Sequence, residues 1–161
     1  KKVLPIFNKK KMLIINGDSL LLRKSNSCPV KKLFKNFNSN YMSILLLLAP
    51  INKSIGYHGG GDFIVKSNSI TSRIERKKNN TSNKSFVFTG WQIIKKEIFN
   101  GIKKDNFSLN LLYNKAQSQN GLFAITLDGY FLHVSTPKSI MQIERFLNVN
   151  KKYLNEKNYI L

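Results

Sequence analysis

The run ILLLLAP, from Ile44 to Pro50, is the longest apolar stretch in the sequence. It is about a third of the ~20 residues that a membrane-spanning helix needs, and its length is typical of a strand buried on both faces of a sheet. A second run, Met12–Asn16 (MLIIN), has the same character. The segment Pro29–Phe37 between them has apolar residues at helical spacing and a proline in its first turn. Strand, helix and strand in this order predict a parallel sheet with a right-handed crossover.

The middle of the chain is predicted to form further strands. Phe63–Val65 and Ser69–Ile74 can form a small hairpin, and the polar segment Arg76–Ser85 is expected to be a mobile or inserted loop. Phe86–Ile94 (FVFTGWQII) is predicted to be a strand interrupted by Gly90.

The last third of the sequence predicts helices and a hairpin. A short helix is expected over residues 95–101, and a longer one over 109–118 with Ser108 as its N-cap. Asp128-Gly129 between two apolar runs predicts a β-hairpin. Thr136-Pro137 predicts the start of a helix that ends near Leu147. We expect one domain over residues 1–147 and a polar tail over 148–161.

Composition narrows the class of protein. The net charge is +19 and the isoelectric point is about 10.2, which invites a nucleic-acid-binding interpretation. The lysines are spread along the chain, however, and Lys, Asn, Ile and Phe are abundant together, so we interpret the charge as compositional drift. A single cysteine, Cys28, leaves no pair for an internal disulfide and indicates a reducing compartment. We therefore expect a cytoplasmic protein with no membrane partner, for which nucleic acid is an unlikely ligand.

The tripeptide Asn16-Gly17-Asp18 follows a predicted buried strand. Ligands of open α/β sheets bind at the carboxyl ends of strands, and a carboxylate there can hold Mg²⁺, which prefers oxygen ligands. Asn-Gly between apolar runs is also a hairpin signal. From spacing alone the two interpretations are equally good.

Two other polar segments could carry chemistry. The segment Ile55–Phe63 (IGYHGGGDF) has glycines that allow close approach of a ligand, although, taken alone, it is better explained as an ordinary flexible loop. The segment Tyr130–Pro137 (YFLHVSTP) places His133 near a helix N-terminus, where anions are favoured. Taken alone, it is better explained as a helix cap.

Five segments in combination resemble the bacterial sugar-1-phosphate nucleotidyltransferases: MLIINGDSLL, ILLLLAP followed by IGYHGGGDF, FVFTGWQII, FSLN at Phe107–Asn110, and DGYFLHVSTP at Asp128–Pro137. The resemblance runs from Lys1 to about Leu147. The nearest branch is the short mannose-1-phosphate guanylyltransferases and N-acetylmuramate α-1-phosphate uridylyltransferases.

The resemblance implies an α/β fold, a Rossmann-like three-layer sandwich with a mixed, mainly parallel central sheet. It implies transfer of a nucleoside monophosphate from UTP or GTP to a sugar 1-phosphate, with release of pyrophosphate and with Mg²⁺ as cofactor. By position in the motifs, it implies metal binding by Asp18 and His133. It implies substrate binding by Asn16, Gly17, Gly56, Gly61, Asp62, Thr89 and Gly90.

The sequence departs from the family pattern in three ways. His133 stands where many relatives have a second aspartate, and Ser135 stands where they have a glycine. The opening Gly-x-Gly-Thr-Arg loop, which carries the family's catalytic residues, does not occur in the sequence. We therefore expect a fragment that lacks the first βα units and is inactive alone. A basic nucleic-acid-binding protein and a decayed remnant without function are the alternatives.

Overall fold

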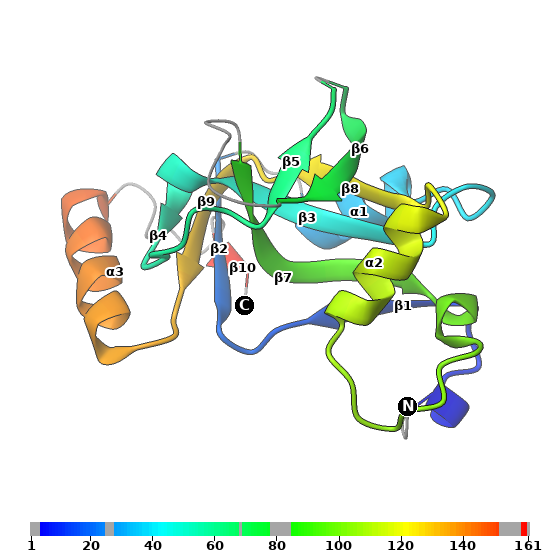
Figure 1. The fold of residues 1–161 in the computed structure, drawn as a ribbon. Helices are drawn as coiled ribbons and strands as arrows, with labels where there is room; N and C mark the ends of the chain where they lie inside the picture. Colours follow the sequence, from blue (N-terminus) through cyan, green and yellow to red (C-terminus); the bar gives the residue numbers. More distant parts are fainter. Residues whose placement is uncertain (1–3, 25–27, 68, 78–84, 152–158, 161) are drawn as a thin grey trace.

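The structure, a computed structural model, describes residues 4–24, 28–67, 69–77, 85–151 and 159–160. Within these residues the strands form two sheets, one of six strands and one of four (Figure 1).

The first sheet has the strand order β1-β7-β3-β8-β6-β5. Its strands are β1 (Lys11–Ile15), β7 (Ser85–Lys95), β3 (Ile44–Pro50), β8 (Leu122–Thr126), β6 (Thr71–Arg76) and β5 (Phe63–Val65). Only β3 and β8 pair in parallel, and the other pairings described are antiparallel. The expected mixed sheet is therefore confirmed, but the expectation that it is mainly parallel is wrong.

β1 and β3 do run in the same direction, since both are antiparallel to β7. The strand that separates them comes later in the chain, so the expected direct strand–helix–strand neighbourhood does not form. β1 is also less buried than expected. It pairs only with β7 in the part of the chain that the structure describes, and Met12 is its only fully buried residue.

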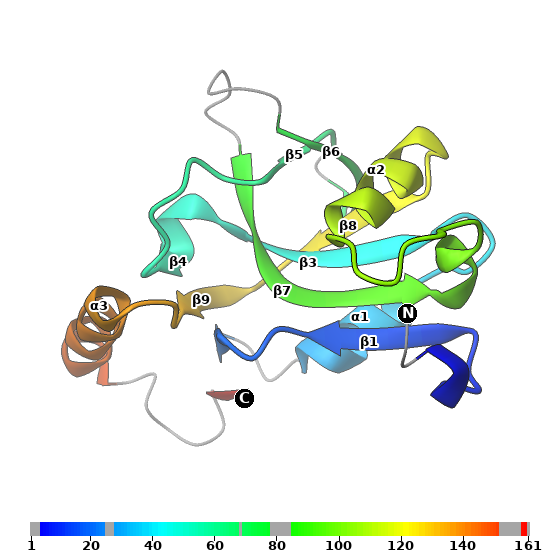
Figure 2. The same ribbon diagram turned by 60° about the horizontal axis from the view of Figure 1, so that its bottom comes forward.

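The first sheet is the middle of three layers, as expected. Alternate side chains of β3 enter two different cores: Leu45, Leu47 and Ala49 pack with α1 (Pro29–Asn36), and Ile44, Leu46 and Leu48 pack with α2 (Asn110–Ser118). Figures 1 and 2 show these helices on opposite sides of the sheet. The apolar run Ile44–Pro50 is thus buried on both faces because a helix covers each face.

The second sheet has the order β10-β2-β9-β4 and was not foreseen. It contains β10 (Tyr159–Ile160), β2 (Ser19–Arg23), β9 (Gly129–His133) and β4 (Ser54–Ile55). The long helix α3 (Pro137–Val149) lies beside it (Figure 1), and Ile143 of α3 packs on Leu22 and Leu132.

The hairpin predicted at Asp128-Gly129 is wrong. The strand before the turn, β8, belongs to the first sheet, and the strand after it, β9, belongs to the second. Gly129 serves a different purpose from the one expected: a Cβ at this position would collide with the carbonyl oxygen of Leu22 on β2. The glycine therefore allows the close pairing of β2 and β9.

The remaining local predictions have mixed outcomes. The β5–β6 hairpin and the helix α3 are confirmed, and the short helix expected at 95–101 is a 3₁₀ helix at Lys96–Phe99. Further 3₁₀ turns occupy Leu4–Ile6 and Ile51–Lys53. The N-cap of α2 is Leu109, without a side-chain cap, although the Ser108 hydroxyl accepts a hydrogen bond from the Asn110 N–H at 3.3 Å.

Two of the predicted segments cannot be described in full. Most of the predicted loop at 76–85 and most of the tail lie outside the described residues, except that β10 of the tail pairs with β2. Among the described helices, none combines the length and apolar character needed to cross a membrane.

Candidate functional site

Asn16-Gly17-Asp18 forms a corner between the two sheets. β1, which precedes it, pairs with β7, whereas β2, which follows it, pairs with β9. The segment is therefore not a hairpin turn, which removes one of the two interpretations left open by the sequence. The Asn16 N–H donates to the carbonyl oxygen of Gly90 at 3.0 Å and ties the corner to β7.

The corner rests on a bulge in β7. The register between β3 and β7 shifts, so that residues 89–91 lie opposite Leu47 alone. Gly90 has a φ of +81°, and a Cβ there would lie 2.7 Å from both the Asn16 Cβ and the Ser19 Oγ. Only glycine fits this backbone conformation and this close approach.

Thr89 lies in the same bulge but points into the core. Its side chain is fully buried, and its hydroxyl donates to the Leu47 carbonyl oxygen at 2.8 Å. This bond satisfies a carbonyl that the bulge removes from regular pairing. Thr89 thus faces the core, whereas the resemblance implies a contact with substrate, and that role stays a prediction.

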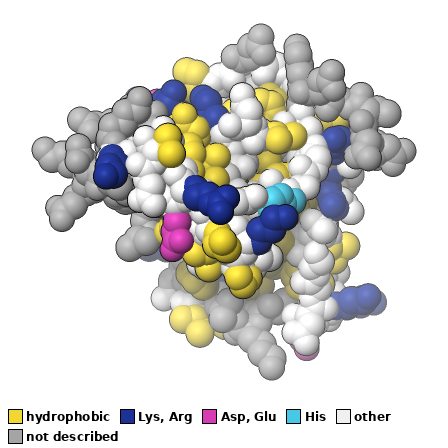
Figure 3. All heavy atoms as spheres, turned by 90° about the vertical axis from the view of Figure 1, so that its left-hand side faces the viewer, with side chains coloured by type: hydrophobic (Ala, Val, Ile, Leu, Met, Phe, Trp, Pro, Cys, Tyr) yellow, Lys and Arg dark blue, Asp and Glu magenta, His cyan; other side chains and the backbone are white. Residues whose placement is uncertain are grey.

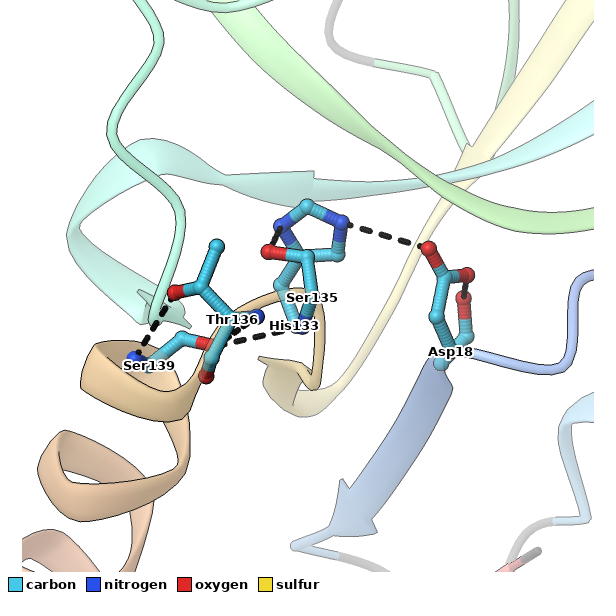
Figure 4. Close-up of polar contacts among 6 residues, drawn as sticks. Asp18, His133, Ser135, Thr136 and Ser139 are labelled. Carbon is cyan, nitrogen blue, oxygen red and sulfur yellow. Dashed lines mark hydrogen bonds and ion pairs between the residues drawn. The ribbon is translucent and has the colours of Figure 1, made fainter.

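Asp18 and His133 meet at the sheet junction. Ser19 lies opposite His133 in the β2–β9 pairing, and the Val134 N–H donates to the Asp18 carbonyl oxygen at 2.9 Å. This register brings His133 Nε2 to 3.5 Å from Asp18 Oδ2 (Figure 4). The side chains are 28% and 45% exposed, respectively, so both can be reached from solvent. Two residues predicted as metal ligands from distant motifs are thus adjacent.

The His133 ring is held on several sides. Its Nδ1 lies 3.4 Å from the Ser135 hydroxyl (Figure 4). The Phe131 ring, two residues earlier on β9, lies 5.6 Å from it between centroids, and the Tyr57 ring lies 6.1 Å away. Gly56, with a φ of +79°, packs against the backbone of His133, since a Cβ there would lie 2.7 Å from the His133 carbonyl oxygen. Gly56 therefore allows β4 and the following loop to approach His133.

The glycine-rich loop after β4 is organised around Tyr57. The Tyr57 hydroxyl donates to Asp62 Oδ1 at 3.2 Å and accepts from the Gly61 N–H at 3.2 Å. Asp62 Oδ2 accepts from the Phe88 N–H of β7 at 2.8 Å. Partial burial, followed by the charge of Asp62, raises the pKa of Tyr57. Asp62 thus holds the loop against β7 through Oδ2 and binds Tyr57 within the loop through Oδ1, while the Tyr57 ring approaches His133.

The start of α3 closes the site. Thr136 is its N-cap, with a capping box in which the Ser139 N–H donates to the Thr136 hydroxyl at 3.1 Å. The Ser139 hydroxyl accepts from the N–H groups of both Ser135 and Thr136, at 3.1 and 2.9 Å. The predicted helix start is confirmed, but these two N–H groups are already bonded within the chain and do not face a free anion site.

Apart from the buried Thr89, the predicted site residues form two groups. Around the Asp18–His133 pair lie Asn16, Gly17, Gly56 and Gly90, whereas Gly61 and Asp62 lie in the glycine-rich loop that Tyr57 connects to His133. Sequence reasoning did not single out Tyr57, Ser19 or Ser139. The first of these lies inside a quoted motif, but only its packing reveals its function.

Electrostatics at this side of the molecule favour anions. Lys and Arg side chains stand among hydrophobic ones on the face that bears α3 and β4, with little acidic surface (Figure 3), and the whole chain carries a net charge of +19.

Among the described residues, no third His, Cys, Asp or Glu joins Asp18 and His133 in a metal-binding group. A metal ion here would have to take its other ligands from water or substrate.

Comparison with known proteins finds similarity to nucleotidyltransferases. No family model matches the chain. The chain is 22% identical, over 144 residues, to the N-acetylmuramate alpha-1-phosphate uridylyltransferase of Caulobacter vibrioides, and the match covers 89% of the chain and 57% of that protein.

Solved structures share its fold. The UTP-bound UGPase from Acinetobacter baumannii matches with a TM-score of 0.68 and 12% identity over 94% of this chain and 58% of that one. The inositol-1-phosphate CTP transferase from T. maritima matches with a TM-score of 0.52 and 15% identity, over 86% of this chain and 54% of that one. The chain thus spans a little over half the length of these relatives, and it has the fold of the sugar-1-phosphate nucleotidyltransferases.

Proposed function

We propose that this chain is the metal-binding and sugar-phosphate-binding part of a nucleotidyltransferase. The reaction would transfer a nucleoside monophosphate from a nucleoside triphosphate to a sugar 1-phosphate. The convergence of Asp18 and His133, 3.5 Å apart at the sheet junction, carries the proposal. These residues come from two motifs that are far apart in the sequence, and both lie beside the glycine-lined corner.

The proposed reaction is an in-line displacement at the α-phosphorus. An oxygen of the sugar phosphate forms the new P–O bond, the bond from the α-phosphorus to the bridging oxygen breaks, and pyrophosphate leaves with that electron pair. Both reactants are anions, so the protein must position them and neutralise the charge that develops. The basic face around α3 supports this role.

The donor set at the junction is compatible with Mg²⁺ at Asp18. The carboxylate is 45% exposed, and its two contacts are long: Oδ1 accepts from the Ser19 hydroxyl at 3.4 Å, and Oδ2 lies 3.5 Å from His133 Nε2. Mg²⁺ usually binds through one or two carboxylates and keeps waters and substrate phosphates as its other ligands. We propose that Asp18 holds Mg²⁺, with His133 as a weaker neighbouring ligand. The ion would neutralise phosphate charge when bound.

The other residues would shape the pocket rather than react. Gly90 and Gly56 allow the Asp18 corner and the His133 backbone to lie close to their neighbours. Asn16 is exposed beside Asp18 and is available to contact a substrate. Gly61 and Asp62 would act through the loop that they hold in place.

The nucleotide in this proposal is UTP or GTP, and the compartment is the cytoplasm. We expect the 161-residue chain by itself to release no pyrophosphate, because its sequence contains no Gly-x-Gly-Thr-Arg loop for the triphosphate. Appreciable pyrophosphate release by the purified chain would contradict this expectation.

Calorimetric titration of the purified chain tests the proposed site. N-acetylmuramate 1-phosphate and mannose 1-phosphate are titrated with and without Mg²⁺ into the wild type, Asp18→Asn and Asp105→Asn. Asp105 is an exposed carboxylate in the loop before α2 and serves as the matched control. We expect Mg²⁺-dependent binding of at least one sugar phosphate, lost in Asp18→Asn and kept in Asp105→Asn. Equal binding by all three proteins, or no binding of either ligand, would refute the proposed site.

A further inference from the structure

The strand β1 leaves one edge of the first sheet unpaired. Among the described strands it pairs only with β7, and Figure 2 shows it at the margin of the sheet. We propose that this edge binds an extended, acidic segment of a second polypeptide, which adds a strand beside β1. The inference goes beyond the proposed function and rests on it only where it brings this partner to the Asp18 corner.

The pairing with β7 determines which backbone groups of β1 are available. The Asn16 N–H donates to the Gly90 carbonyl oxygen at 3.0 Å, and the Lys10 carbonyl oxygen accepts from the Lys96 N–H at 2.8 Å. Because hydrogen-bonded pairs alternate along an antiparallel ladder, the even-numbered residues of β1 face β7. The residues whose N–H and C=O groups point to the open side are therefore Lys11, Leu13 and Ile15. An added strand would pair with these groups.

Apolar side chains flank this edge on both faces of the sheet. On the face of α2, a hollow beside Met12 and Ile14 is lined largely by apolar residues: Leu4, Phe7, Phe99, Phe107 and Leu109. On the face of α1, a second hollow contains Phe34 and Phe37. The large apolar side chains that stay 40–42% exposed around the edge are Phe7, Ile15 and Phe34. An added strand directs alternate side chains to the two faces, so it would fill both hollows and cover these residues.

The charge around the edge selects the partner. The second hollow is also lined by Lys9, Lys10, Lys11 and Lys95. Lys95 pairs with Glu97 at 2.7 Å, whereas the other three form no ion pair within the part of the chain that the structure describes. Lysines on an edge strand disfavour pairing with a second copy of the same strand, and two chains of net charge +19 repel each other. An acidic segment is attracted instead, so it fits this edge better than a second copy does.

A strand on this edge would also reach the proposed site. β1 leads directly into Asn16-Gly17-Asp18, so the polypeptide at one end of the added strand would lie level with Asp18. The match to the Caulobacter protein covers only 57% of that protein, so a protein of this kind can include more polypeptide than this chain supplies. The partner would therefore bring further side chains to the metal and phosphates of the proposed reaction.

Amide hydrogen exchange of the whole chain, followed by NMR without metal or sugar phosphate, tests the inference. The probes are the synthetic peptide Asp-Glu-Val-Thr-Val-Thr-Val-Thr and a control peptide with Lys-Lys in place of Asp-Glu. In the chain alone, the amides of Leu13 and Ile15 should exchange at least about tenfold faster than those of Met12 and Ile14. The acidic peptide should slow the exchange of Leu13 and Ile15, and it should bind at least about tenfold more tightly than the control peptide at low salt.

Two matched pairs of variants locate the binding. Ile15→Pro removes an N–H that points to the open side, whereas Ile15→Ala shortens the same side chain and keeps the N–H, so the proline should weaken peptide binding more. Lys9→Glu combined with Lys10→Glu should reverse the preference between the two peptides. Lys103→Glu combined with Lys104→Glu makes the same charge change at exposed residues before α2 and should leave the preference unchanged.

Three results would overturn the inference. Leu13 and Ile15 amides as protected in the chain alone as those of Met12 and Ile14 would mean that the edge is already covered. Equal binding of the two peptides, or binding of neither, would exclude an acidic partner. A dimer in sedimentation experiments that Ile15→Pro dissociates would assign the edge to a second copy of the chain. Because metal and sugar phosphate are left out, none of these results depends on whether the proposed sugar-phosphate site binds its ligand.

Discussion

Replacing Gly90 by alanine tests whether the bulge in β7 builds the corner that carries Asp18. Gly90 has a φ of +81°, and an added Cβ would lie 2.7 Å from the Asn16 Cβ and from the Ser19 Oγ. These two residues flank Asp18 on either side, so a shift at Gly90 is transmitted to the carboxylate. Gly17→Ala is the matched control, because a Cβ at Gly17 would meet no atom within 4 Å.

Two costs add in Gly90→Ala. Placing an L-residue in the left-handed region costs roughly 1–2 kcal/mol, and forcing an extra carbon into a packed site costs roughly 1–3 kcal/mol. We therefore expect the free energy of unfolding to fall by about 2–5 kcal/mol. Gly17→Ala should change it by less than about 1 kcal/mol, or raise it slightly, because alanine restricts the unfolded chain.

Urea unfolding followed by tryptophan fluorescence measures both variants. Trp91, the single tryptophan of the chain, adjoins Gly90 and is buried. Metal affinity, measured on the same samples below the unfolding transition, should fall in Gly90→Ala and stay unchanged in Gly17→Ala. If Gly90→Ala keeps wild-type stability, or if the two variants are equally destabilised, the close approach inferred at this corner is wrong.

Three further predictions concern residues around the site and the core. Thr89→Val removes the donor to the buried Leu47 carbonyl and should lower the free energy of unfolding by about 1–3 kcal/mol in chemical denaturation. The sugar-phosphate affinity should not change. A loss of affinity without a loss of stability would instead support the substrate contact that the resemblance implies. Thr136→Ala should lower the stability by about 1 kcal/mol in thermal melts, while Thr136→Ser should retain most of it. Burial raises the pKa of Tyr113 from 10.0 to about 12. The contribution of its neutral phenol to the free energy of unfolding is therefore complete below pH 10, and about 2–3 kcal/mol is lost as the pH rises towards 12. Denaturation at several alkaline pH values should show this loss in the wild type, and Tyr113→Phe should abolish it.

Local sequence patterns predicted most helices and strands correctly, but they did not predict which strands pair with one another. The apolar run at Ile44–Pro50 correctly predicted a strand buried on both faces, because a strand covered on both sides consists almost entirely of apolar residues. The composition of a strand does not indicate the direction of its neighbours. The neighbour β7, which runs antiparallel to it, comes from much later in the chain.

Two turn signals show the same limit. Asp128-Gly129 and Asn16-Gly17 both have hairpin-like composition, yet each connects strands in different sheets. A turn signal reports the local backbone, whereas strand pairing is decided by which tertiary surfaces bury the following strand. The glycine at 129 is needed for its approach to β2, which no local pattern could reveal.

The candidate site was predictable in part because its residues lie in motifs whose order resembles a known family. Asp18 and His133 were named as a pair from that resemblance, and the structure brings them together. The burial of Thr89 could not be predicted, because a β-bulge changes which side of the strand a residue faces. Tyr57 was overlooked because its packing against His133 depends on the folded loop.

NMR shift mapping with N-acetylmuramate 1-phosphate and Mg²⁺ tests the central claim most directly. If the sheet junction is the sugar-phosphate site, the perturbed amides should cluster at residues 16–19, at Gly56 and at residues 133–136. Perturbations confined to a distant cleft, such as the one lined by Lys103, Lys104 and Lys115, or no perturbation at saturating ligand, would contradict the claim.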